Sequence, residues 1–77
     1  MNNYEVVTSM SVQLERIFTY HSPKDDQPER YVALRDEAKK LAYLIVKNVP
    51  PSREQTLAIT HLEEAIFYAN AAIARNE

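Results

Sequence analysis

The sequence predicts an all-α protein with a short N-terminal helix and a long antiparallel helical hairpin. Apolar residues recur at steps of three and four along most of the chain, which is the period of one helix face. Two adjacent prolines, Pro50 and Pro51, interrupt this pattern between its two longest stretches. A chain of 77 residues has room for one domain only. We therefore expect a single helical-hairpin domain over residues 1–77.

The first helix is expected within Tyr4–Phe18. Steps of three and four link four apolar residues on one face: Val7, Met10, Leu14 and Ile17. Thr8 or Ser9 could cap this helix, and Ser11 offers a rival start. Residues 1–3 are expected to form a frayed end.

The second helix is expected to start at Asp25 or Asp26, either of which can act as its N-cap. Pro28 suits the first helical turn, where no backbone donor is needed. The apolar stripe of this helix consists of Tyr31, Leu34, Ala38, Leu41 and Ile45. The helix is expected to end at Val49, because the following proline disfavours a helical conformation there.

The third helix is expected to begin after Ser52. Ser52 and Gln55 have the spacing of a capping box, in which each side chain bonds the other residue's backbone N–H. The helix is expected to run to Arg75, with an apolar stripe of Ile59, Leu62, Ile66, Ala69 and Ile73. A short link between the second and third helices predicts an antiparallel hairpin.

A chain this small is expected to associate with copies of itself. Small domains bury a modest share of their surface and usually rely on disulfides, a metal or oligomerisation. The chain has no cysteine and two histidines, so association is the support that remains. Ala58, Ala65 and Ala72 repeat every seven residues beside the main stripe of the third helix. They reflect either high helix propensity or a second packing face for another subunit.

Composition excludes several functional classes. A net charge of −2 does not suit a protein that coats DNA. The chain contains no glycine, so it cannot form the glycine-rich phosphate loops of nucleotide-binding proteins. No apolar run is long enough for a membrane-spanning helix or a signal-peptide core. Together with the absence of cysteine, this predicts a cytoplasmic protein without a DNA or membrane partner.

Metal binding and catalysis have little support. His61 and Glu64 share a helix face, but two ligands are too few for a metal site, and a solvated face is the favoured interpretation. The adjacent Glu63 and Glu64 diverge on a helix, so they do not form an acid–base pair. We expect no metal, no cofactor, no catalytic residue and no enzymatic activity.

The loop between the first two helices, F-T-Y-H-S-P-K-D-D-Q-P-E-R-Y, is unusual for a connector. It and the next helical turn concentrate aromatic and cationic side chains: Tyr20, His21, Lys24, Arg30, Tyr31 and Arg35. Aromatic faces stack on nucleobases, and lysine and arginine neutralise phosphates. We interpret Phe18 and Tyr31 as core residues. Tyr20 either packs under the loop or contacts a ligand, and the resemblance described below favours a functional role for Tyr20 and Lys24.

A second small cluster lies at the expected start of the third helix. Arg53, Thr56 and Thr60 share one helix face beside Ser52. A helix N-terminus with hydroxyls and an arginine can bind an anion. On the residues alone, helix capping and a solvated face are favoured over an anion site.

The loop, with L-R-D-E-A-K-K-L-A and P-P-S-R-E-Q-T-L-A-I-T-H-L-E-E-A-I-F-Y-A-N-A-A-I-A-R-N, resembles a family of helical-hairpin phage anti-defence proteins. In particular, it looks like the anti-CBASS cyclic-nucleotide sponges, whose hairpin is shared with anti-Thoeris sponges. The resemblance covers roughly residues 18–76. It implies a homohexamer in the host bacterial cytoplasm that binds cyclic dinucleotides, and in some members cyclic trinucleotides, without cleaving them. Such binding blocks activation of the CBASS effector.

The resemblance also implies site residues. The contacts to the dinucleotide would come from Tyr20, His21, Pro23, Lys24, Gln27, Tyr31 and Arg35. A second nucleotide site where subunits meet would come from Arg53, Thr56 and Thr60. Three alternatives stay open: an anti-Thoeris sponge for cyclic ADP-ribose-type signals, a helical adaptor that binds a host protein, and a small nucleotide hydrolase.

Overall fold

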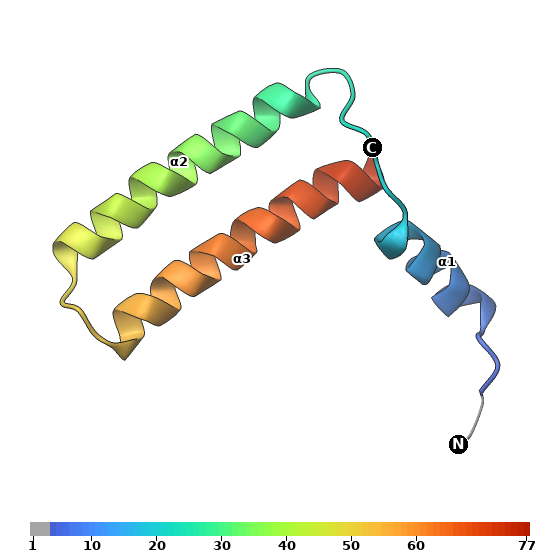
Figure 1. The fold of residues 1–77 in the computed structure, drawn as a ribbon, viewed down its shortest axis with the longest axis horizontal. Coiled ribbons are helices and arrows are strands. Elements are labelled where there is room, and N and C mark those ends of the chain that lie inside the picture. Colours follow the sequence, from blue (N-terminus) through green and yellow to red (C-terminus); the bar gives the residue numbers. More distant parts are fainter. Residues whose placement is uncertain (1–3) are drawn as a thin grey trace.

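The computed structural model describes residues 4–77 and arranges them as three α-helices with no strand among them (Figure 1). Helix α1 spans Thr8–Phe18, α2 spans Gln27–Asn48 and α3 spans Arg53–Asn76. The predicted all-α hairpin is confirmed for these residues. The expected frayed end, residues 1–3, lies outside them. Within residues 4–77, every helix is too short or too polar to span a membrane.

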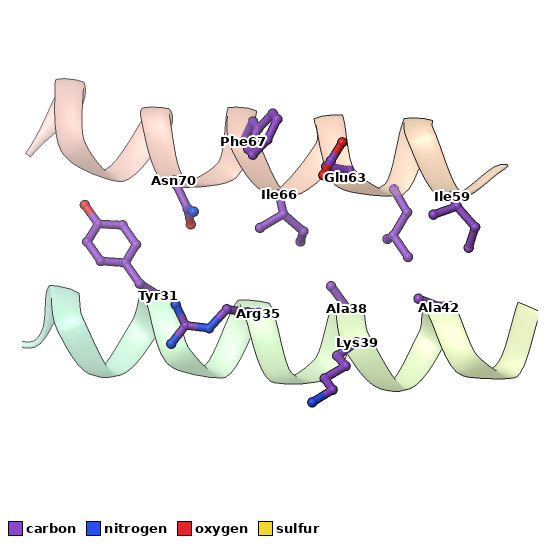
Figure 2. A pocket seen from close by; sticks show the side chains of 11 residues that line it. Tyr31, Arg35, Ala38, Lys39, Ala42, Ile59, Glu63, Ile66, Phe67 and Asn70 are labelled. Carbon is purple, nitrogen blue, oxygen red and sulfur yellow. The ribbon is translucent and has the colours of Figure 1, made fainter. Parts of the chain in front are cut away.

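Helices α2 and α3 lie side by side and run in opposite directions, joined by a short link at residues 49–52 (Figure 1). Large side chains of α3 face small ones of α2: Figure 2 shows Ile59 and Ile66 directed towards Ala38 and Ala42. One residue of the predicted stripe, Leu41, lies outside the seam. Leu41 is 44% exposed, and Ala42 takes the inner position.

The link between the long helices largely follows its prediction. Val49 is the extended C-cap of α2, as expected before a proline. Ser52 caps α3, and its hydroxyl oxygen accepts a hydrogen bond of 3.1 Å from the backbone N–H of Gln55. The reciprocal half of the capping box is absent, because the Gln55 side chain donates to the carbonyl oxygen of Val49 instead.

The predicted caps of the first helix are wrong. Val7 occupies the N-cap position of α1 and makes no side-chain capping bond. Thr8, Ser9 and Ser11 all lie inside the helix, so none of them caps it.

At the start of α2, Asp26 occupies the N-cap position, and Pro28 lies in the first turn as predicted. The Asp26 carboxylate does not cap the helix; it lies 3.2 Å from Nε of Arg30. Asp25 has a positive φ of 52°, a left-handed conformation that aspartate adopts more readily than most residues. This conformation closes a turn in which the Gln27 N–H donates to the carbonyl oxygen of Lys24 at 2.9 Å.

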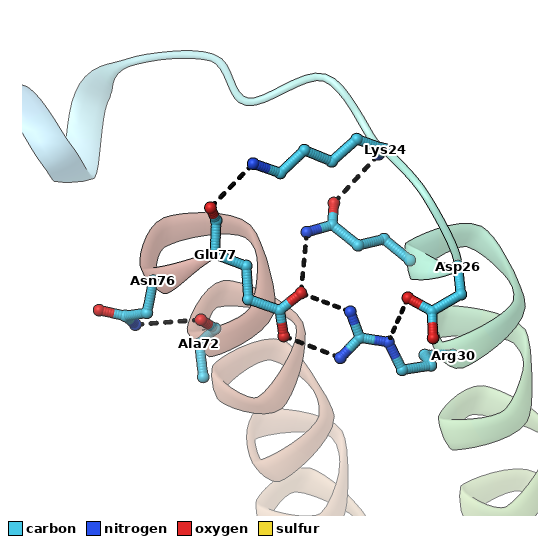
Figure 3. A network of polar contacts seen from close by, with 7 residues as sticks. Lys24, Asp26, Arg30, Ala72, Asn76 and Glu77 are labelled. Carbon is cyan, nitrogen blue, oxygen red and sulfur yellow. Dashed lines mark hydrogen bonds and ion pairs between the residues drawn. The ribbon is translucent and has the colours of Figure 1, made fainter.

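A group of polar contacts, which we call the Glu77 clasp, fastens this turn to the end of α3 (Figure 3). The Glu77 carboxylate accepts from Nε2 of Gln27 at 3.1 Å and from both terminal nitrogens of Arg30. The Nζ atom of Lys24 donates to the main-chain oxygen of Glu77 at 2.8 Å. Gln27 is 3% exposed, the one buried side chain among residues 4–77, and its Oε1 also accepts from the Lys24 N–H. The sequence did not predict this clasp.

The described chain has no fully buried apolar side chain. Phe18 was predicted to be core, but it is 80% exposed. The radius of gyration is 17.4 Å, and the molecule measures 50 × 40 × 15 Å. A compact domain of this length would have a radius of gyration of about 11.5 Å. One copy is therefore an open, flat arrangement of helices.

Helix α1 points away from the hairpin (Figure 1). Its apolar face is largely uncovered, with Val7 63% and Met10 45% exposed. Two polar contacts tie its C-terminal end to the rest: Arg16 donates to Oδ1 of Asn76 at 3.5 Å, and His21 bonds the Arg16 carbonyl oxygen. Most of the apolar face of α1 is thus uncovered within residues 4–77, and only Ile17 at its C-terminal end lies near α3.

The Glu77 clasp predicts a pH dependence of stability. Hydrogen bonds from Arg30 and then from Gln27 lower the pKa of Glu77 from its ordinary 4.5 to about 2. Because the folded chain favours the ionised carboxylate, the contribution of Glu77 is complete above pH 4.5 and is lost as the pH falls through about 2. Thermal unfolding between pH 6 and 2 should show a gap in Tm between the wild type and Glu77→Gln that closes on acidification.

We expect this gap to be small, because the Arg30 and Glu77 side chains are 38% and 40% exposed. The control is Glu63→Gln, which removes the same charge from the middle of α3 and should show no such gap. A Glu77→Gln gap that stays constant down to pH 2 would contradict the assignment.

Candidate functional site

An open hollow of about 520 Å³ lies between the loop after α1, the first turns of α2 and the last turns of α3. Four of the predicted site residues line it: Tyr20, His21, Tyr31 and Arg35. Asn70 and Arg75 of α3 line it as well. The hollow thus brings together aromatic rings, two guanidinium groups and an amide from the loop, from α2 and from α3.

A second hollow of about 400 Å³ adjoins the first. Lys24, Gln27 and Glu77 line it, so the Glu77 clasp forms one of its walls. Tyr20, His21, Ala74 and Arg75 line both hollows. We refer to the two together as the loop site. Six of the seven residues predicted for the dinucleotide pocket border it; the exception is Pro23, which is exposed and lines neither hollow.

Local sequence explains why this end of the molecule is hollow. Ala71 and Ala74 present small side chains on the turn of α3 that faces the loop, which leaves space above them. The loop between Thr19 and Lys24 has no regular structure, so its side chains are not confined to one face. Tyr20 is 82% exposed, so its ring is available for stacking and does not pack under the loop.

The cationic side chains of the loop site differ in whether they already have a hydrogen-bond partner. Lys24 is held by the main-chain oxygen of Glu77. Within residues 4–77, the side chains of Arg35 and Arg75 form no hydrogen bond or ion pair, although both line the larger hollow. A guanidinium group presents a planar fork of donors that matches a phosphate. Arg35 and Arg75 are therefore available to a bound anion.

His21 has a structural bond in addition to its place in the loop site. Its Nε2 atom lies 3.1 Å from the carbonyl oxygen of Arg16. A carbonyl oxygen can only accept, so this contact requires the proton on Nε2. The bond ties the ring to the end of α1, and the same residue lines both hollows of the loop site.

Asn70 carries an unsatisfied polar atom. Its Oδ1 is buried and has no hydrogen-bond partner among the described residues. Figure 2 shows the amide directed from α3 towards Tyr31 and Arg35 of α2. A buried amide oxygen normally accepts a hydrogen bond. The structure buries it beside the larger hollow, where a donor from a ligand or from another subunit would satisfy it.

An apolar groove of about 450 Å³ continues from the larger hollow along the hairpin (Figure 2). Tyr31, Arg35 and Asn70 line both. Phe67 borders the groove and is 62% exposed. The loop site therefore opens onto an apolar surface between α2 and α3.

The second predicted cluster lies at the other end of the hairpin (Figure 1). Arg53, Thr56 and Thr60 are exposed on the first turns of α3 and line none of the hollows described above. The Thr56 hydroxyl donates to the carbonyl oxygen of Ser52 at 3.2 Å. These residues share a helix face as predicted, but one copy of the chain does not build a pocket around them.

His61 and Glu64, which were expected to lie on a solvated helix face, are both exposed. Nδ1 of His61 lies 3.7 Å from the carboxylate of Glu64, and their side chains are 72% and 49% exposed. Residues 4–77 contain no group of three or more histidine, cysteine, aspartate or glutamate side chains placed to bind a metal.

Sequence reasoning missed the part of the loop site that α3 supplies. In an antiparallel hairpin, the last turn of the third helix lies beside the first turn of the second. The predicted helices therefore already placed Arg75 next to Gln27 and Tyr31, and counting along them would have found it. Glu77 had no such signal, because its role depends on side-chain hydrogen bonds.

Comparison with known families agrees with the helical-hairpin fold. Residues 10–74 match the family model described as Acb2/Tad1, hairpin domain. No curated protein and no solved structure matches the chain. The family match covers most of the chain, from the first turn of α1 to the last turns of α3, and it confirms the resemblance. The chain is therefore a member of the Acb2/Tad1 hairpin family of phage anti-defence sponges for cyclic nucleotide signals.

Proposed function

We propose that this protein sequesters cyclic dinucleotides in the loop site without cleaving them, and so prevents activation of CBASS effectors. One observation carries the proposal: the structure brings the exposed ring of Tyr20 into one hollow with the uncommitted guanidinium groups of Arg35 and Arg75. The protein acts as a single helical-hairpin domain over residues 1–77, in the host cytoplasm where the messengers are made.

The lining of the loop site suits a purine-containing ligand with phosphates. Tyr20 and His21 offer ring faces for base stacking, which contributes about 1–3 kcal/mol per base. Arg35, Arg75 and Lys24 offer charge-assisted donors to phosphate oxygens. These groups bind such a ligand by contact alone, which fits the non-catalytic character of the family.

Assembly would complete the site. Both hollows are open, and most of the apolar face of α1 is uncovered within one described copy. We propose a homohexamer in which neighbouring copies cover α1 and close the loop site over the ligand. Arg53, Thr56 and Thr60, exposed at the other end of the hairpin, would form a second site for cyclic trinucleotides where subunits meet.

Two other functions are considered: one would use the loop site, and the other the exposed apolar side chains of α3. A cyclic ADP-ribose-type signal presents the same purine and phosphate groups, so an anti-Thoeris role differs in the ligand and not in the chemistry of the site. A helical adaptor for a host protein would use the exposed apolar side chains of α3, of which Phe67 is 62% and Tyr68 is 72% exposed.

A release experiment tests sequestration. The protein is incubated with cyclic di-AMP, cyclic tri-AMP and cyclic ADP-ribose in turn, freed of unbound ligand and denatured by heat. We expect cyclic di-AMP to be recovered unchanged by chromatography and mass spectrometry. A linear or hydrolysed product would show an enzyme. Retention of none of the three, together with capture of a host protein, would show an adaptor.

Substitutions test the assignment of the loop site. Tyr20→Ala and Lys24→Ala should each abolish or strongly weaken binding of cyclic di-AMP, because they remove a stacking face or a phosphate donor. Loss of one stacked base corresponds to a decrease in affinity of roughly tenfold to a hundredfold. Calorimetry measures the affinity, and size-exclusion chromatography should show the same assembly as the wild type.

The matched variants are Tyr20→Phe, which keeps the ring, and Lys47→Ala, which removes an exposed lysine near the far end of α2. Both should bind as the wild type does. Unchanged affinity in Tyr20→Ala and Lys24→Ala would show that the pocket lies elsewhere.

A further inference from the structure

We propose that Gln27 and Arg30, with Lys24 beside them, form an anion site that the Glu77 carboxylate fills in the free chain and that a ligand phosphate takes by displacing it. This inference rests on the proposed function. It adds Arg30 to the phosphate contacts and makes Glu77 an internal competitor that sets the affinity of the loop site.

The geometry around Glu77 is that of a bound anion (Figure 3). Both terminal nitrogens of Arg30 donate to its carboxylate, one at 2.8 Å, and Nε2 of Gln27 donates at 3.1 Å. A carboxylate and a phosphate accept the two parallel bonds of a guanidinium fork in the same way. The donors that hold Glu77 are therefore also correct for a phosphate.

The donors stay in place when the carboxylate leaves. Gln27 is 3% exposed, and its Oε1 is fixed by the backbone N–H of Lys24 at 3.1 Å. Arg30 has a second partner, because Asp26 lies 3.2 Å from its Nε atom. The donor set is thus held by contacts within the loop and the first turn of α2 and does not depend on Glu77.

Glu77, in contrast, can be displaced. Its side chain is 40% exposed, and the ion pair it forms with Arg30 faces water, where such pairs contribute little to stability. The same carboxylate borders the smaller hollow of the loop site together with Lys24 and Gln27. Tyr20 lines this hollow too, so a ligand that stacks on Tyr20 there occupies the hollow that the Glu77 carboxylate borders.

Displacement has a functional consequence. An anion that has only a single weak contact competes poorly with a carboxylate that is always present, so it binds only at high concentration. A ligand that also stacks on Tyr20 competes better, since its base supplies the additional free energy. Glu77 would thus discriminate against free phosphates in favour of nucleotides that use the whole loop site.

The test uses inorganic pyrophosphate as the probe and the side-chain amide resonance of Gln27 as the reporter. In the wild type this resonance should move only at high pyrophosphate concentration. In Glu77→Gln it should saturate at a concentration about twofold to fivefold lower, the range that an exposed ion pair supplies. Glu63→Gln removes the same charge from the middle of α3 and should titrate as the wild type does.

Adding Arg30→Ala to Glu77→Gln should remove the gain in pyrophosphate affinity. Equal pyrophosphate affinity in the wild type and Glu77→Gln, or a gain that survives Arg30→Ala, overturns the proposal. If circular dichroism shows that Glu77→Gln is unfolded, the wild-type titration decides, because a Gln27 resonance that never moves excludes an anion at this place.

A second experiment distinguishes failure of this inference from failure of the proposed function. Calorimetry with cyclic di-AMP should show tighter binding by Glu77→Gln than by the wild type. If neither chain binds cyclic di-AMP while the pyrophosphate titrations behave as expected, the dinucleotide function fails and the anion site stands. If both bind it equally and pyrophosphate does not distinguish them, the function stands and the displacement of Glu77 is wrong.

Discussion

The seam between α2 and α3 is the one extended packing interface that residues 4–77 contain, and it is too narrow to bury any apolar side chain completely. Two helices touch along a line, so each keeps most of its circumference in contact with water. Such a seam supplies little apolar burial to offset the conformational entropy lost on folding. The exposed apolar face of α1 and the open groove beside Phe67 follow from this constraint. Further copies of the chain would provide the missing cover.

The same hairpin explains the place of the loop site. Because α2 and α3 are antiparallel and of similar length, the turn that begins α2 comes to lie beside the last turn of α3. In the free chain, the Glu77 clasp joins the two helix ends through the buried side chain of Gln27. Small residues on α3 then leave room beneath Tyr20. The loop site is therefore formed where the ends of α2 and α3 meet, whereas the apolar groove is formed along the seam between them.

The sequence predicted much of the fold, and the predictions that were wrong or missing have physical causes. Helical periodicity and the proline pair fixed the long helices, because these signals are local. The core assignment of Phe18 was wrong since it assumed a core that one copy does not have. The N-cap of α1 was wrong because three hydroxyl residues compete within four positions. The clasp was missed because it joins residues some fifty positions apart through side-chain bonds, such as that of Gln27 to Glu77.

We propose that one copy is incomplete and that the assembly is the folded, ligand-binding unit. Sedimentation equilibrium of the purified protein at micromolar concentration tests it most directly. The account predicts a mass that is a fixed multiple of the single chain, with six copies expected, and loss of helical circular dichroism whenever dilution separates the copies. A single chain that sediments alone and still unfolds cooperatively would contradict it, because the seam between α2 and α3 would then be sufficient without a partner.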